Sequence, residues 1–351
     1  MKYSAIRYGF PLAAGLSLAV AATVVQADGP KSMDVASTFA TTNFLGAGAK
    51  HLAEQIDITT GGAVKLRVHE PGDLVPPFEV FNSVSSGAVD AGWDWIGYWA
   101  GTVPVTNLYG ALPFGPTPDA FMSWMWAGDG TKLLQSAYDQ YNVHVLPCFI
   151  SPQETGGWYN KEINSVEDFK GLRMRISGLG AKVLSKLGAS TQLIPGNEIY
   201  LALERGRIDA TEFSIPQVDQ AMGFNEIAKY YYFPGWHQSA SWFSFIVNKD
   251  VWDKYSDERK AQMETACRST LQWSMAGAAE KQVQIIDELK AKGVEVRRFP
   301  DPVLKALRST WDEVRAEEEK ANPRFKEAYE SLMKYVDLND QWYKLQELPR
   351  D

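Results

Sequence analysis

Arg175 and Glu212 are the residues of this chain best placed to bind a charged ligand. Arg175 lies near the end of residues 171–177, where apolar and polar side chains alternate as in a half-buried strand. A guanidinium at such a strand end can hold a small carboxylate through two parallel charge-assisted hydrogen bonds. The alternative is an arginine paired with an acidic neighbour, and the residues alone favour it.

Glu212 lies near the end of a second predicted strand, residues 209–214, and Phe213 follows it. A carboxylate in this place needs a cationic partner, either an arginine or a bound metal ion. Because α/β proteins bind ligands at the carboxyl ends of their strands, these two strand ends mark the candidate site. The aromatic run 93–99 follows another predicted strand and fits either a cleft wall or a core layer.

Strand-like and helix-like stretches alternate along the chain, which predicts an α/β fold with mostly parallel strands. Residues 33–39 and 64–69 are predicted strands on either side of a helix over 43–57. A helix–Gly–x–x–Asp–strand junction occurs twice, at Gly87 and at Gly206. Two ordinary junctions can look alike by chance, but one lies in each half of the chain. The pattern therefore favours two similar α/β lobes with a cleft between them.

The tail from 301 to about 348 has a helical pattern with two apolar stripes, and Pro323 should break or kink it. A helix of this length cannot bury its whole stripe on one small lobe. It should therefore either span both lobes or pack on a second subunit.

The N-terminus has the layout of a secretory signal peptide. Lys2 and Arg7 precede an uncharged segment, 10–25, and a small-x-small site ends at Ala27. We expect residues 1–27 to be removed, the alternative being an uncleaved anchor. Loss of two basic residues takes the formal charge from −8 to −10. Such an acidic surface repels phosphate, which argues against nucleic acid as a partner.

The sequence lacks the common catalytic motifs. Its four histidines show no metal-binding spacing, and no nucleophile elbow, Walker loop or dinucleotide fingerprint occurs. For Cys148 and Cys267, a disulfide and a pair of buried thiols fit an exported chain equally well.

Residues 70–74, 166–175 and 198–209 resemble the DctP-type extracytoplasmic solute-binding proteins of tripartite ATP-independent periplasmic (TRAP) transporters, most strongly in Lys-Gly-Leu-Arg-Met-Arg at 170–175. The resemblance implies a two-lobed α/β periplasmic binding protein of the Venus-flytrap type with a long kinked C-terminal helix. It places 28–149 with 241–275 in lobe I, 150–240 with 276–300 in lobe II, and 301–351 in the C-terminal helix. It makes Arg175 the main clamp on the ligand carboxylate.

Residues 151–158, 212–213 and 230–237 resemble the branch of this family that binds 2-oxoacids together with a cation. The resemblance implies that the Gln153 side chain, the Glu212 carboxylate and the Phe213 backbone carbonyl bind that cation, and that Gln153 also contacts the ligand. Oxygen ligands suit Na⁺ or Ca²⁺ better than a transition metal.

Three aromatic residues complete the expected site. The resemblance implies that Tyr98 donates a hydrogen bond from the opposite lobe, and Trp95 and Trp236 are further candidates for the pocket wall. Phe213 stands where this branch often has Trp, which leaves the ligand length open.

The resemblance implies a periplasmic, non-enzymatic protein that captures a small monocarboxylate, such as the 2-oxoacid pyruvate. It would deliver the ligand to small and large TRAP membrane subunits for ion-gradient-driven uptake, and would form a homodimer by exchanging the C-terminal helix. The alternatives are another ligand, such as lactate, a dicarboxylate, a sugar acid or an aromatic acid, and a metal-dependent lyase at Glu212. The lyase is weakened because His237 is its only candidate base.

Overall fold

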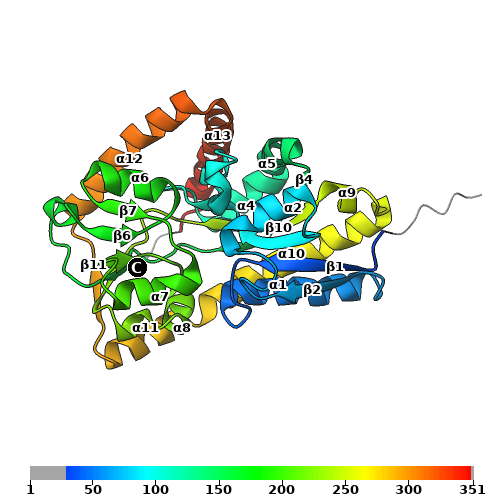
Figure 1. Ribbon diagram of the computed structural model, residues 1–351. Helices are drawn as coiled ribbons and strands as arrows, with labels where there is room; N and C mark the ends of the chain where they lie inside the picture. The colour runs from blue at the N-terminus through cyan, green and yellow to red at the C-terminus, as the bar shows by residue number, and fades with distance from the viewer. Residues whose placement is uncertain (1–28, 349–351) are drawn as a thin grey trace, which may run out of the picture.

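The computed structural model describes residues 29–348, and their strands form two separate sheets (Figure 1). The first sheet has the order β2–β1–β3–β10–β4: Lys65–His69, Ser32–Ser37, Ala91–Trp95, Ser241–Asn248 and Val143–Ser151. The second has the order β11–β9–β5–β8–β6–β7: Glu295–Arg298, Tyr230–Phe233, Gly157–Tyr159, Ala210–Thr211, Arg173–Arg175 and Ser190–Gln192. This is the predicted two-lobed α/β fold. The predicted signal peptide, 1–27, lies outside the described residues.

The chain passes from one sheet to the other more than once. It leaves the first sheet between β4 and β5 and returns between β9 and β10. It leaves again from α10 (Asp257–Glu280), which packs on β4 and on α1 (Phe44–Thr59), into α11 (Gln282–Ala291), which packs on α8 (Pro216–Ala221). Several connections between two lobes are what a hinged binding protein needs, because they guide a rigid-body closure.

The repeated junction has the same structural role in both halves. Gly87 ends α2 (Val80–Ser86) with a φ of 77°, and Gly206 follows α7 (Gly196–Glu204) with a φ of 64°. This left-handed conformation favours glycine. The following aspartates, Asp90 and Asp209, each accept a 3.0 Å hydrogen bond from a backbone N–H of the neighbouring parallel strand, β1 or β6. The junctions are therefore structurally equivalent.

The tail forms two helices, α12 (Asp301–Ala321) and α13 (Pro323–Leu345), so the predicted break at Pro323 is confirmed. Asn322 between them is extended, with φ −133° and ψ 97°, and its side chain caps α13 at the N–H of Phe325. Helix α12 packs on α6 (Gly178–Lys186), while α13 packs on α4 (Pro118–Ala127) and α5 (Gly130–Tyr138). The two helices form an arch from one lobe to the other (Figure 1). Within the single chain, the tail thus contacts both lobes.

Cys148 and Cys267 form a disulfide that joins β4 to α10. Both residues are buried in the first lobe. Among residues 29–348, no helix has the combination of length and apolar character that a membrane span requires.

Candidate functional site

Arg175 and Glu212 form a buried ion pair at neighbouring strand ends. Arg175 is the last residue of β6, and Glu212 directly follows the parallel strand β8. Arg175 Nη1 donates to Glu212 Oε1 and to the Glu212 backbone carbonyl, both at 2.8 Å, and the two side chains are only 3% and 1% exposed. The residues alone favoured an acidic neighbour as the partner of Arg175, and that neighbour is Glu212. Glu212 is also the second candidate site residue.

This pairing leaves part of the guanidinium available. Of its five N–H donors, two on Nη1 bind Glu212, and Nε donates to the Ile194 carbonyl at 3.2 Å. Nη2 donates no hydrogen bond to any described residue. A ligand carboxylate can thus bind Arg175 through the two N–H groups of Nη2.

A small cavity between the lobes is lined by Arg175 of this pair. Its volume of about 10 Å³ is close to that of one water molecule, so the structure is in a closed arrangement. The first sheet and its helices contribute Phe39, Leu45, Trp95, Tyr98 and Phe243, and the rest of the lining is Glu154, Arg175, Ser177, Phe213 and Gln238. A ligand can enter only when the lobes separate.

The aromatic run 93–99 contributes both to the cavity wall and to the core, which are the two roles that the sequence left open. Trp95 and Tyr98 line the cavity, whereas Trp93 is fully buried and donates to the Leu45 carbonyl at 2.9 Å. Trp99 is also buried and donates to the carboxylate of Asp94. Burial raises the pKa of Tyr98 to about 12, so its hydroxyl keeps its proton and can donate to an anion.

Asp94 stabilises the segment that carries Tyr98 in the cavity wall. Its carboxylate is fully buried in β3 and accepts hydrogen bonds from the Trp99 indole and the Ser244 hydroxyl of β10. The 3-10 turn Ile96–Gly101, which carries Tyr98, is held to the sheet by the Trp99 bond. Burial outweighs these bonds and raises the pKa of Asp94 to about 7.

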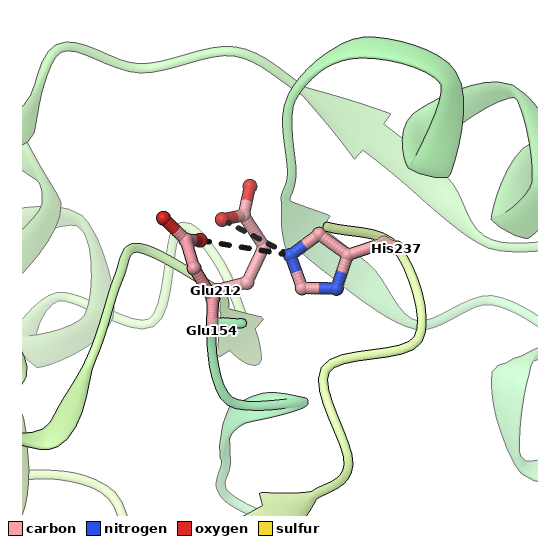
Figure 2. A group of neighbouring side chains, drawn as sticks. All are labelled: Glu154, Glu212 and His237. Atoms are coloured by element: carbon pink, nitrogen blue, oxygen red, sulfur yellow. Dashed lines mark ion pairs between the residues drawn. The ribbon is translucent and has the colours of Figure 1, made fainter. Parts of the chain in front are cut away.

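Three titratable side chains converge beside Arg175 (Figure 2). His237 Nε2 lies 3.5 Å from Glu212 Oε2 and 3.9 Å from Glu154 Oε2, and one donor atom of each residue lies within 4.8 Å of the others. All three are buried, and neither Glu154 Oε2 nor the His237 nitrogens have a hydrogen-bond partner among the described residues. Unpaired buried polar atoms are unfavourable, so this cluster fits a bound cation.

The two carboxylates differ in electrostatic environment. Burial raises the pKa of Glu212, but Arg175, His237 and the Ser177 N–H outweigh it and hold that pKa at about 2. Burial raises the pKa of Glu154 well above its usual range, and the Glu212 carboxylate adds to this shift. Glu212 is therefore ionised, while Glu154 is protonated unless a cation is bound nearby.

The structure does not bring Gln153 to the site. Its side chain is exposed, donates to the Gly235 carbonyl at 3.4 Å, and lines a separate cavity of about 220 Å³. Glu154 faces the site instead. Adjacent side chains of an extended segment point in opposite directions, so an error of one residue exchanges the inward and outward positions.

Trp236 is also absent from the cavity wall. It is buried against Phe114, with ring centroids 6.1 Å apart, and its carbonyl accepts from the Phe114 N–H at 2.8 Å. The next two residues, His237 and Gln238, take part in the site instead. Phe213 lines the cavity as predicted, with its ring 5.3 Å from the Arg175 guanidinium.

Residues 35–321 match the bacterial extracellular solute-binding proteins, family 7, known as DctP. The chain belongs to this family. A monocarboxylate 2-oxoacid-binding periplasmic protein of Nostoc sp. is 31% identical over 301 residues, which are 86% of this chain and 83% of that protein. This chain is thus a TRAP solute-binding protein, a class of periplasmic proteins that bind small carboxylates and work with membrane subunits.

Two solved structures are similar over nearly the whole DctP chain. A TRAP solute-binding protein of Bordetella bronchiseptica is 30% identical, with a TM-score of 0.86 over 90% of this chain and 94% of that one. It is a mixed-occupancy dimer with a calcium- and picolinate-bound active site and an apo site. A second, from Pseudoalteromonas atlantica, contains sodium and pyruvate and is 31% identical, with a TM-score of 0.85 over 90% and 96% of the chains.

Proposed function

We propose that this protein captures a small 2-oxoacid such as pyruvate, together with a cation, in the periplasm and passes it to TRAP membrane subunits for ion-gradient-driven uptake. The observation that carries the proposal is that Arg175, from the candidate anion site, and Glu154, from the candidate cation site, line the same cavity. Arg175 Nη2 is the free donor for the anion, and the unpartnered oxygen of Glu154 lies beside Glu212 for the cation. The solved relatives that contain a carboxylate with sodium or calcium support this pairing.

Each side chain has a distinct part in capture. Arg175 neutralises and orients the ligand carboxylate, and Tyr98 donates a hydrogen bond to it from the other lobe. Glu212 and the Phe213 carbonyl, with Glu154 in place of Gln153, would hold the cation. When bound, the cation supplies positive charge that attracts ligand oxygens to a pair of protein carboxylates. The aromatic side chains exclude water, which strengthens these interactions.

The size of the closed cavity favours a small ligand. Phe39, Phe213 and Phe243 surround the remaining space of about 10 Å³, so only modest opening is compatible with the same lining. A sugar acid or an aromatic acid would need a larger opening than pyruvate, but the picolinate-bound Bordetella relative shows that a related site accommodates an aromatic acid. The choice of a 2-oxoacid therefore rests on the relatives that bind one.

Binding without turnover is part of the proposal. A lyase would need a base facing the substrate, whereas His237 Nε2 faces the two carboxylates of the cation cluster and its ring is buried. Incubation of the protein with pyruvate and Ca²⁺, followed by product analysis, should show unchanged substrate.

The binding proposal is tested by isothermal titration of pyruvate into Arg175→Ala and Arg173→Ala. Arg173 lies two residues earlier on β6, but its side chain is 48% exposed and pairs with Asp209. We expect Arg175→Ala to weaken binding at least about 100-fold, since a charge-assisted bond in a desolvated site is removed. The control should bind as the parent does. Equal affinity in both variants would overturn the site assignment.

We also propose that the protein forms a homodimer through the end of α13. This helix leaves several large apolar side chains exposed to solvent: Leu338, Trp342, Tyr343 and Leu345, at 54–79%. Such a cluster on one helix end is typical of an interaction surface. The dimeric Bordetella relative supports the proposal.

A further inference from the structure

We infer that this protein has a second small-molecule site, outside the cleft and on the first lobe, which binds a carboxylate with an apolar body such as a medium-chain fatty acid. The site is a cavity of about 420 Å³ between α4, α5, β4 and α10. Ligand pockets typically have volumes of about 300–1,000 Å³, so this cavity has room for such a molecule. It shares no lining residue with the cavity between the lobes.

Much of the cavity wall is apolar. Met125 and Trp126 of α4 line it on one side, and Leu146 and Pro147 of β4 line it on another. Trp126 packs on Trp242, with ring centroids 5.3 Å apart, yet it remains 39% exposed. An apolar ligand body would cover this indole and the wall beside it. Removal of apolar surface from water is the main favourable term in such binding.

The polar part of the lining favours an anion. Lys132 of α5 and Arg268 of α10 line the cavity, and neither forms an ion pair with a residue in 29–348. Glu264 contributes one negative charge, so the charged side chains of the lining sum to +1. This local excess is opposite in sign to the formal charge of the chain, −8. One carboxylate would balance it, and a carboxylate accepts charge-assisted hydrogen bonds from both cations.

His144 adds no charge to this lining at neutral pH. Burial lowers the pKa of His144 to about 4, and its ring stacks on Trp252 with centroids 4.1 Å apart. The charged groups that act on it are two cations and two anions, which cancel: Lys249, Lys260, Asp139 and Asp253. The net positive charge of the lining therefore comes from Lys132 and Arg268.

A peptide strand is the competing occupant, because β4 is an edge strand of the first sheet. The backbone of that edge is already occupied beside the cavity. The Gln135 side chain accepts from the Val145 N–H at 3.0 Å and donates to the Val143 carbonyl at 3.1 Å. Pro147, the next alternate residue, has no N–H to donate. A strand cannot pair here, whereas a small molecule needs only the side chains of the wall.

The walls of the cavity all belong to one lobe. Helix α10 and helix α5 pack on β4, and α4 packs on α5. A rigid-body movement of the second lobe therefore leaves the cavity unchanged, and binding here should be independent of ligand in the cleft.

The experiment is isothermal titration of octanoate into the parent protein, with acetate and 1-octanol as probes that lack the apolar body or the charge. We expect one octanoate per chain. Acetate should bind at least about 100-fold more weakly, since it lacks six methylene groups that gain free energy on burial. Octanol should bind at least about tenfold more weakly, since it cannot form charge-assisted hydrogen bonds. Saturating pyruvate should change the octanoate affinity by less than about twofold.

Lys132→Gln/Arg268→Gln removes both cations and should weaken octanoate binding at least about tenfold while pyruvate binding stays parental. The matched control is Lys305→Gln/Lys320→Gln, which removes two exposed lysines of α12 and should leave both affinities unchanged. Equal losses of octanoate affinity in the two double variants would overturn the site, as would a parent that does not bind octanoate.

Two further outcomes would place octanoate or the cavity elsewhere. Competition between octanoate and pyruvate would assign octanoate to the cleft and overturn the second site. Binding by Trp342→Glu/Leu345→Glu but not by a dimeric parent would show that a second copy of the chain covers the cavity, which also overturns it. Pyruvate binding is measured in the same proteins, so a parent that binds octanoate without pyruvate would contradict the proposed function alone.

Discussion

Arg175 gives both hydrogens of Nη1 to Glu212, one to the carboxylate and one to the backbone carbonyl of the same residue. These two hydrogen bonds fix the orientation of the guanidinium. Its free Nη2 group is therefore already positioned before a ligand binds. Such preorganisation reduces the entropy that binding must overcome.

The pair also makes a prediction about stability. Arg175→Ala leaves Glu212 charged and buried without its partner, and removing one member of a buried ion pair costs about 3–5 kcal/mol. We expect a loss of this size in the free energy of unfolding from urea denaturation. The double variant Arg175→Met/Glu212→Leu should be more stable than Arg175→Ala. A double variant that is less stable than Arg175→Ala would contradict the explanation.

Asp94 should make the protein less stable as the pH rises. Its pKa is raised from 3.8 to about 7 by burial, so between these values the folded state holds a proton that the unfolded state has lost. Stability from this group is full below about pH 4 and is lost as the pH rises through about 7. Asp94→Asn cannot ionise and keeps one acceptor and one donor for Trp99 and Ser244. Its unfolding free energy should therefore improve relative to the parent from pH 4 to pH 8.

The size of that change follows from the shift. About three pKa units correspond to roughly 4 kcal/mol at most, measured as the difference between parent and variant across the pH range. The exposed Asp287→Asn serves as a surface control, since the Asp287 side chain is 69% exposed. A parent-to-Asp94→Asn difference that stays constant with pH would show that Asp94 does not titrate in this range.

The disulfide should stabilise the first lobe without affecting the site. Cys148 and Cys267 are 119 residues apart in the chain, and closing a loop of this length contributes about 2–4 kcal/mol in typical cases. We expect Cys148→Ala/Cys267→Ala to lose that amount in urea denaturation and to bind pyruvate with parental affinity. Reductant should destabilise the parent and leave the double variant unchanged.

Charge placed on the exposed end of α13 should dissociate the dimer. Trp342→Glu/Leu345→Glu puts two carboxylates on a surface that is apolar in the parent, and burying them at an interface is unfavourable. Sedimentation analysis should show parent dimer and variant monomer. Leu201→Glu, at a leucine on α7 that is 46% exposed, should leave the dimer intact. If the parent is monomeric at micromolar concentration, the dimer proposal is wrong.

The sequence predicted the parts of the site that lie at strand ends. Arg175 and Glu212 follow regular alternating patterns, so strand periodicity identifies them. The two Gly–x–x–Asp junctions could also be predicted from the sequence, because a left-handed glycine and a strand-capping aspartate form a short local motif.

Other parts depend on tertiary structure that no local pattern encodes. Gln153 and Glu154 are neighbours in an extended segment, and only the packing of both lobes decides which of them faces the cavity. His237 lies in the irregular segment between β9 and β10, where no periodicity shows its orientation. The disulfide could not be predicted because it depends on the packing of β4 against α10, and that packing is visible only in the folded structure.

The α12–α13 arch has a mechanical consequence. Its feet stand on different lobes, on α6 at one end and on α4 and α5 at the other, and the only extended residue between the two helices is Asn322. A rotation that opens the cleft must therefore either change the angle at this joint or shift one of the helices on its lobe. In both cases the position of α12 relative to α13 or to its lobe differs between the open and the closed arrangement.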